Sequence, residues 1–202
     1  MRKSSIEGAK IFTDSRMSAA SASAPVDVAW TVAEDAAMAN VVQRGVARAD
    51  AERDFTVKVD VRGLQPGRTY HYAFEALGVR SEVGRTRTAP TGAVERLRFG
   101  MVSCASYAHG LFHVYRSLAE QPDLDCVLHL GDYVYEYASD AYGSFRAYEP
   151  SNETITLADY RARHAQYKRD ADAQELHRQH PMVPIWDDHE VANDAWLRGA
   201  QN

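Results

Sequence analysis

The stretch Met182-Val183-Pro184-Ile185-Trp186-Asp187-Asp188-His189-Glu190 joins a short apolar run to a run of charge. The apolar part predicts a buried strand. Two carboxylates and an imidazole then follow in adjacent positions, which is costly at a buried strand's end unless the charge is compensated. A metal ion, a phosphoryl group or both would supply that compensation, so we expect the chemistry of the chain to lie here.

Two upstream strands end in a similar manner. An apolar run over 125–130 ends in Gly131-Asp132, and a strand over 97–104 ends in Cys104. A helix predicted over 109–121 lies between them, which makes a βαβ unit with a right-handed crossover and a parallel sheet. Because the C-terminal ends of parallel strands meet at one edge of a sheet, we expect the three strand ends to lie close together.

A long polar loop and two helices separate the second and third strand ends. Residues 136–155 are rich in Tyr, Ser and Ala, which is typical of binding loops in α/β proteins. Thr156, with Asp159 three residues on, predicts a capped helix, and a second helix follows over about 171–180. The Arg161/Arg163 pair is typical of a solvated helix face, and an arginine near a phosphate site is the alternative.

The N-terminal part carries the signals of a separate β domain. Alternating apolar residues predict three strands in it, over 26–32, 55–61 and 70–76. Short strands separated by Pro- and Gly-bearing turns fit an all-β sandwich. The segment 64–72, Leu-Gln-Pro-Gly-Arg-Thr-Tyr-His-Tyr, resembles the E–F corner of fibronectin type III domains.

Composition shifts divide the chain into three parts. Small and polar residues dominate 1–25, which we interpret as an irregular lead-in. A polar, Pro/Gly-bearing stretch over 86–92 marks a domain boundary. The expected domains are therefore a β-sandwich over 26–90 and an α/β domain over 95–202.

The overall composition excludes several classes of protein. The 202 residues are 45% hydrophobic and 25% charged with a net charge of −5, so no basic surface for nucleic acid or anionic lipid is expected. A phosphate ligand is still compatible, because bound metal ions supply local positive charge. No apolar run approaches the roughly 18 residues of a membrane span. No signal peptide is visible behind Met1. Two cysteines form no disulfide framework, although a single bridge stays possible.

The residue types at two strand ends favour a metal site. Gly131 allows a sharp turn that aims Asp132 at the sheet edge, where each carboxylate oxygen can serve one cation. Tyr135 lies about one turn further on, and its phenolate is a strong ligand for a hard trivalent ion such as Fe³⁺. A Cys104 thiolate would be an anionic partner for the same ion. Taken singly, Cys104 is more often a small buried hydrophobe and Tyr135 an aromatic loop contact.

Several separated motifs resemble those of PhoD-like alkaline phosphatases and phosphodiesterases. They are Ser103-Cys104, Gly131-Asp132-Tyr133-Val134-Tyr135-Glu136 and the run from Trp186 to Asp194. Residues 26–90 resemble the immunoglobulin/fibronectin-like N-terminal domain of that family. The resemblance implies a calcineurin-like metallophosphoesterase of the four-layer α/β/β/α type. The expected fold is an all-β immunoglobulin/fibronectin-like sandwich followed by a partial α/β metallophosphoesterase domain whose second half is missing.

The resemblance also implies a set of metal ligands. It assigns iron to Cys104, Asp132 and Tyr135, and it places calcium ions near residues 187–190. Asp188 takes a metal-ligand place, and His189 would hydrogen-bond the phosphoryl oxygen or the leaving group. The further ligand candidates are Asp187 and Asn193.

The implied activity is hydrolysis of a small phosphomonoester or phosphodiester, with His189 and Asp132 as the catalytic residues and an extracytoplasmic location. Family members continue well beyond the length of this chain, so we expect a fragment with weak or no activity of its own. The alternative function is a non-catalytic β-sandwich binding module carrying a phosphatase remnant. A cysteine hydrolase built on Cys104 has no supporting local signature.

Overall fold

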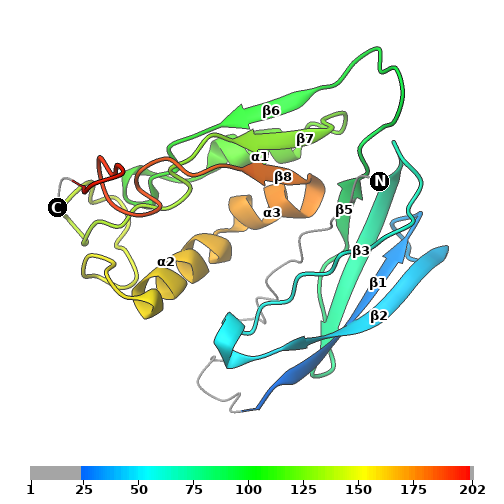
Figure 1. Ribbon diagram of the computed structural model, residues 1–202, viewed down its shortest axis with the longest axis horizontal. Coiled ribbons are helices and arrows are strands. Elements are labelled where there is room, and N and C mark those ends of the chain that lie inside the picture. Colours follow the sequence, from blue (N-terminus) through cyan, green and yellow to red (C-terminus); the bar gives the residue numbers. More distant parts are fainter. Residues whose placement is uncertain (1–23, 201–202) are drawn as a thin grey trace. The chain divides into compact units, whose positions relative to one another are not determined.

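The computed structural model describes residues 24–200 of the chain (Figure 1). The chain divides into two compact units, each described by itself below. Within the described residues, the N-terminal unit comprises 24–97 with His177–Pro181, and the C-terminal unit comprises Arg98–Leu176 with 182–200. The predicted lead-in over 1–25 lies outside the described residues except for its last two. Within the described residues, no helix has the length and apolar character needed to cross a membrane.

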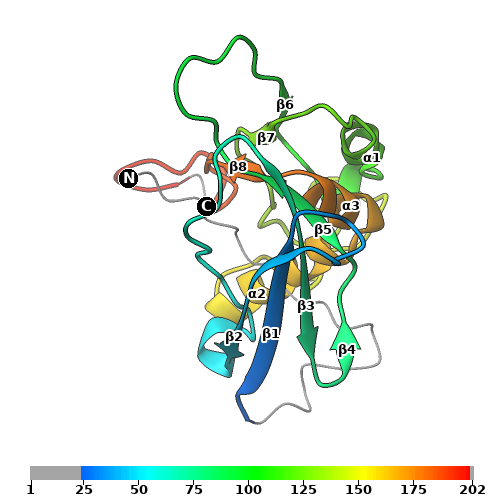
Figure 2. The same cartoon turned by 90° about the vertical axis from the view of Figure 1, so that its right-hand side faces the viewer.

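The N-terminal unit is built on one antiparallel sheet. Its strands are β1 (Val26–Ala33), β2 (Val41–Ala49), β3 (Thr69–Ala76), β4 (Val79–Arg80) and β5 (Gly84–Arg87). The order is β2-β1-β3-β4, and β5 pairs with another part of β3 (Figure 2). Trp30 on β1 lies opposite Gly45 on β2. A Cβ at Gly45 would come within 2.6 Å of the Trp30 ring, so only glycine lets the indole lie flat there.

The structure confirms two of the three predicted strands in this unit. β1 and β3 bury the expected faces, with Val28, Val32, Tyr70 and Phe74 in the core. The prediction of a third strand over 55–61 is wrong, because this segment belongs to no strand in the described part of the chain.

The alternation of the 55–61 segment nevertheless identifies the side chains that face the core. Val57 and Val61 are buried against the sheet. Asp54 and Phe55 have φ angles of 53° and 50°, which turn the chain out of a strand path. Because the described residues of this unit form a single sheet, the immunoglobulin-like sandwich stays a prediction.

The C-terminal unit contains the predicted parallel sheet. Its elements are β6 (Phe99–Val102), α1 (His113–Ala119), β7 (Cys126–His129), α2 (Leu157–Arg169), α3 (Ala171–Gln179) and β8 (Met182–Pro184). The strand order is β6-β7-β8 with both pairings parallel, as the βαβ pattern predicts. The last residues of α3 group with the N-terminal unit. Thr156 and Asp159 form the predicted capping box at the start of α2.

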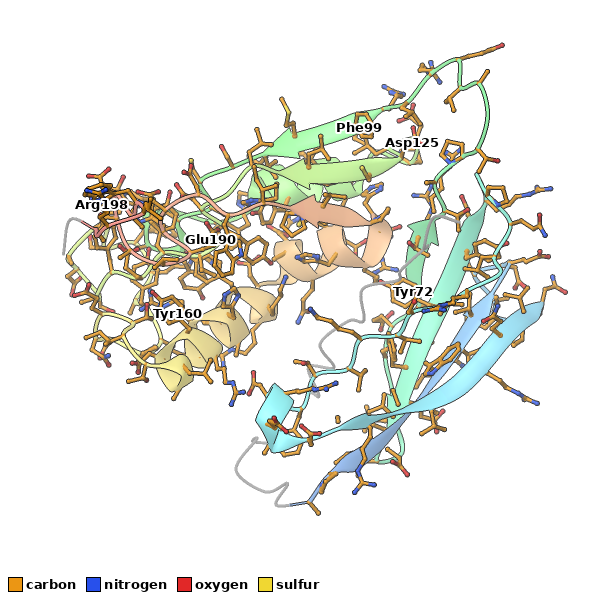
Figure 3. All side chains as sticks on the ribbon, viewed as in Figure 1. Tyr72, Phe99, Asp125, Tyr160, Glu190 and Arg198 are labelled. Carbon is orange, nitrogen blue, oxygen red and sulfur yellow. The ribbon has the colours of Figure 1, made fainter. Side chains whose placement is uncertain are left out.

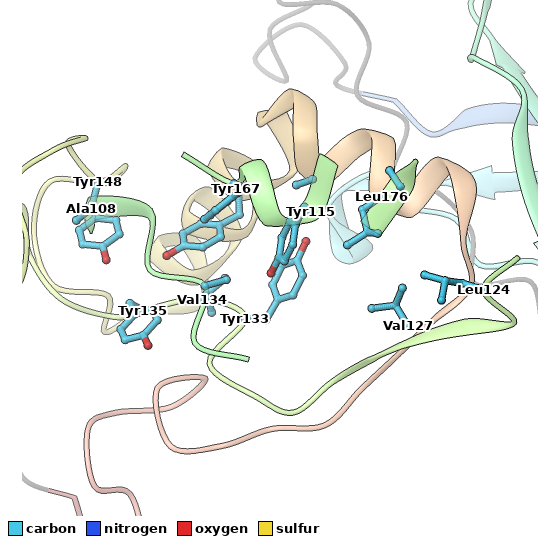
Figure 4. Packing of buried hydrophobic residues seen from close by; sticks show 14 residues of the cluster. Ala108, Tyr115, Leu124, Val127, Tyr133, Val134, Tyr135, Tyr148, Tyr167 and Leu176 are labelled. Atoms are coloured by element: carbon cyan, nitrogen blue, oxygen red, sulfur yellow. The ribbon is translucent and has the colours of Figure 1, made fainter. Parts of the chain in front are cut away.

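An aromatic core lies on one side of this sheet. Tyr115, Tyr133 and Tyr167 pack together with Val127 of β7 and Leu176 of α3 (Figure 4). The opposite side chains of the sheet are apolar but exposed, and they include Phe99, Met101, Val183 and Ile185. The buried apolar contacts of the unit therefore lie on the packed side, and all three strands run from it to the same sheet edge.

Replacing Leu176 by alanine tests this core. Leu176 is fully buried, so Leu176→Ala should lower the free energy of unfolding by about 2–5 kcal/mol. The matched control is Leu157→Ala at the start of α2, where the leucine is 67% exposed. Urea unfolding should show a small change, within about 0.5 kcal/mol, for the control. Equal losses in the two variants would contradict the assigned core.

Candidate metal centre

The three predicted strand ends meet at one edge of the parallel sheet. The backbone N–H of Cys104, after β6, donates to the carbonyl of Gly131, after β7, at 3.1 Å. The next N–H donates to the carbonyl of Asp132 at 2.8 Å. A Cβ on Gly131 would lie 2.5 Å from the backbone nitrogen of Asp187, so the segment after β8 passes directly against the same turn. The convergence expected from parallel strands is therefore present.

Two site residues hold unusual backbone conformations. Cys104 and Asp132 have φ angles of 57° and 53°, in the left-handed region that non-glycine residues rarely adopt. Gly131, beside them, has a φ of 102°. Strain of this kind persists where the surrounding contacts over-determine the conformation, and it concentrates at functional sites.

Asp132 is the centre of the cluster. Its Oδ2 accepts a hydrogen bond from the Tyr135 hydroxyl at 3.2 Å. Its Oδ1 is buried and has no hydrogen-bond partner. Burial raises the pKa of this carboxyl group, while the Cys104 thiol and the Tyr135 hydroxyl oppose the rise by hydrogen bonding to it. A buried carboxylate oxygen without a partner is rare, and it calls for a ligand.

Two residues after β8 complete a group that could hold a cation. One ligand atom from each of Asp132, Asp188 and His189 can be chosen so that all lie within 4.8 Å of one another. Burial alone would raise the pKa of Asp188, but hydrogen bonds from backbone amides, that of Asp194 first, lower it overall. Asp188 is therefore held as an anion at neutral pH.

His189 is oriented by a buried glutamate. Its Nδ1 lies 2.8 Å from Oε2 of Glu136, and Glu136 is almost fully buried. The imidazole also packs on the rings of Tyr135 and Tyr137, with centroids 4.3 and 5.3 Å away. Because Nδ1 is engaged, Nε2 is the ring nitrogen left for chemistry.

The remaining two ligand candidates, Asp187 and Asn193, belong to the same segment after β8 as Asp188 and His189. The segment that carries Asp187 packs against Gly131, and the Asp187 carboxylate is close enough to raise the pKa of Asp132. The side-chain amide of Asn193 donates to Asp194 at 3.3 Å, and its backbone N–H donates to Glu136 at 2.6 Å. The ligand assignments of both residues stay predictions.

Three further residues organise the site and were not among the predicted site residues. Glu136 and Glu190 are conspicuous as acidic residues inside two of the quoted motifs, but nothing local identifies their partners. Arg163 corrects the expectation of a solvated face, because its side chain is fully buried. Its guanidinium donates to backbone carbonyls of the loop that follows β7, those of Tyr135, Tyr137, Glu149, Pro150 and Asn152.

Comparison with known proteins gives matches over both parts of the chain. The family model described as PhoD-like phosphatase matches residues 99–202. The model for the N-terminal domain of PhoD-like phosphatase matches residues 7–90, beginning inside the predicted lead-in. Alkaline phosphatase D of Bacillus subtilis (strain 168) is 41% identical over 175 residues, which cover 84% of this chain and 30% of that protein.

A solved structure titled "Structure of PhoD" also matches, with a TM-score of 0.81 and 40% sequence identity. The match covers 84% of this chain and 33% of that one. The chain therefore spans about a third of the length of the proteins that it resembles.

His129 provides a pH test of the packing beneath the site. This strand residue is fully buried, and its Nε2 lies 2.9 Å from the Tyr115 hydroxyl. Burial lowers its pKa from 6.5 to about 4, so the unfolded chain binds a proton that the folded chain does not between these values. Stability from this group is complete above about pH 6.5 and should fall by about 3 kcal/mol as the pH drops to 4.

The variant His129→Gln keeps an acceptor for Tyr115 and removes the titration. Between pH 7 and 4, the free energy of unfolding of this variant should fall by about 3 kcal/mol less than that of the wild type. Urea unfolding at the two pH values measures the difference. The control His109→Gln removes an exposed imidazole and should keep the wild-type slope. An unchanged slope in His129→Gln would overturn the assignment.

Proposed function

Because this chain belongs to the PhoD-like phosphatase family, we propose that it contributes to a metal-dependent phosphoester hydrolase whose metal centre is the cluster at the ends of β6, β7 and β8. The observation that carries this proposal is the buried, unpartnered Oδ1 of Asp132 beside Asp188 and His189. The substrate class is a small phosphomonoester or phosphodiester. The resemblance also favours an extracytoplasmic location.

The donor atoms fit two kinds of cation. A thiolate from Cys104, a phenolate from Tyr135 and a carboxylate from Asp132 suit Fe³⁺, which prefers anionic ligands. Oxygen donors from Asp187, Asp188 and Asn193 suit Ca²⁺. When bound, such ions would act as Lewis acids that neutralise charge on the phosphoryl oxygens.

His189 is the candidate for proton transfer. Glu136 accepts the hydrogen bond from Nδ1 and fixes the ring, so Nε2 of the neutral ring is an acceptor. The protonated ring can donate from Nε2 to the leaving-group oxygen, and the Glu136 carboxylate stabilises that imidazolium. The ring thus accepts and returns a proton at one defined atom.

Metal binding tests the centre directly. Iron(III) added to the purified chain should produce a visible absorption band from phenolate and thiolate ligands. Tyr135→Phe should shift or abolish the band, because it removes the phenolate. The matched control is Tyr142→Phe, whose ring lies 6.1 Å from that of Tyr135 and is exposed, and it should keep the band. A band that is absent from the wild type, or unchanged in Tyr135→Phe, would exclude the proposed iron ligands.

Hydrolysis provides the second measurement. Any phosphomonoesterase or phosphodiesterase activity of the iron- and calcium-loaded chain should be lost in Asp132→Ala. The alternative, a non-catalytic β-sandwich binding module, requires that residues 98–200 bind neither ion. Binding in the wild type that depends on Asp132 would decide against that alternative.

A further inference from the structure

Glu190, labelled in Figure 3, joins two separate segments at the sheet edge through its carboxylate. Its Oε2 accepts the backbone N–H of Asp132 at 3.1 Å and that of Asp187 at 2.8 Å. Its Oε1 accepts the backbone N–H of Tyr133 at 2.5 Å. One carboxylate therefore holds three main-chain donors, two of them from the turn after β7 and one from the turn after β8. Hydrogen bonds to an ionised acceptor are roughly twice as strong as neutral ones.

Glu136 makes the reciprocal connection. It belongs to the segment after β7, and it accepts from the imidazole of His189 at 2.8 Å and from the backbone N–H of Asn193 at 2.6 Å. Each segment thus contributes one glutamate whose oxygens are bound by donors of the other segment. This reciprocal pair links the Asp132 turn to the Asp188-His189 segment through hydrogen bonds of the protein itself.

We propose that Glu190 is a positioning residue that pre-organises the metal centre by holding the Asp132 turn against the Asp187–His189 turn. The inference rests on the proposed function, because it assigns a purpose to the spacing of those candidate ligands. A local turn cap would need only the bond from Asp187, three residues away. The other two donors lie 58 and 57 residues away in the sequence. Gly131 supports the same reading, because any side chain there would force the two turns apart.

The variant Glu190→Gln tests this role. A glutamine amide places an NH₂ group against at least one main-chain N–H, because both carboxylate oxygens accept from such donors. The affinity for iron(III), measured by titration of the visible band, should fall about 10–100-fold, as is typical when outer-shell partners of a metal site are lost. Glu190→Asp keeps the charge but is one methylene too short to reach both turns, and it should also weaken binding.

The matched control is Asp170→Asn. Asp170 is also a carboxylate that accepts two backbone N–H groups in the same unit, those of Asp172 and Ala173. This variant should lose stability in urea unfolding but keep the wild-type iron affinity. If Asp170→Asn weakens iron binding as much as Glu190→Gln does, the effect is general destabilisation and the positioning role is excluded.

Amide hydrogen exchange in the metal-free chain separates this inference from the proposed function. The N–H groups of Asp132 and Tyr133 should exchange about tenfold faster in Glu190→Gln than in the wild type, and those of α2 should not. If the exchange rates of these N–H groups are unchanged in Glu190→Gln, the positioning role is overturned whatever the metal-binding data show. A wild type that binds no iron overturns the proposed function and the positioning role with it. A wild type that binds iron no more tightly than Glu190→Gln overturns the positioning role alone.

Discussion

The burial of carboxylates at the end of one three-stranded parallel sheet is the constraint on which the C-terminal unit depends. Asp132 and Glu136 lie almost completely out of solvent. Transferring an unpaired carboxylate from water to such a place costs several kcal/mol, so each one needs donors. Glu136 and Glu190 have them, from an imidazole and from four backbone N–H groups. Of these three carboxylates in the described part of the chain, Asp132 alone keeps a buried oxygen without a partner, and this difference separates the candidate ligand from its supports.

Much of the C-terminal unit could be predicted because its signals are local. The apolar run before Gly131 and the capping box at Thr156 each depend on neighbours within a few residues, and both are present in the structure. Strand β2 was not predicted, because it carries Gln43 and Arg44, lacks a clean alternation and lies at the edge of the sheet that the described residues form. The 55–61 alternation identified core side chains but not a strand, since the positive φ angles of Asp54 and Phe55 turn the chain and Val59 alone in this segment forms a β-bridge.

The supports of the site escaped prediction for a physical reason. Glu190 bonds to residues almost 60 positions away, and Arg163 bonds to carbonyls spread over a long loop. Contacts between residues so far apart in the sequence produce no periodicity or residue spacing within a short stretch of the chain. An arginine on a helix is usually solvated. The burial of Arg163 depends on the loop that surrounds it, and only the three-dimensional structure shows this loop. The donors of Arg163 bind carbonyls of this loop, which contains neither helix nor strand, and two of the bonded carbonyls flank Glu136.

The left-handed conformations of Cys104 and Asp132 connect these supports to the site. A positive φ is uncommon in residues other than glycine, and each such residue costs about 1–3 kcal/mol. Tertiary hydrogen bonds compensate this cost: the N–H of Cys104 binds the carbonyl of Gly131, and the N–H of Asp132 binds Glu190. Both bonds link different strand ends, so the strained conformations require the strand ends to be assembled. The arrangement of the candidate ligands is therefore a property of the assembled sheet edge and of the hydrogen bonds that join its strand ends.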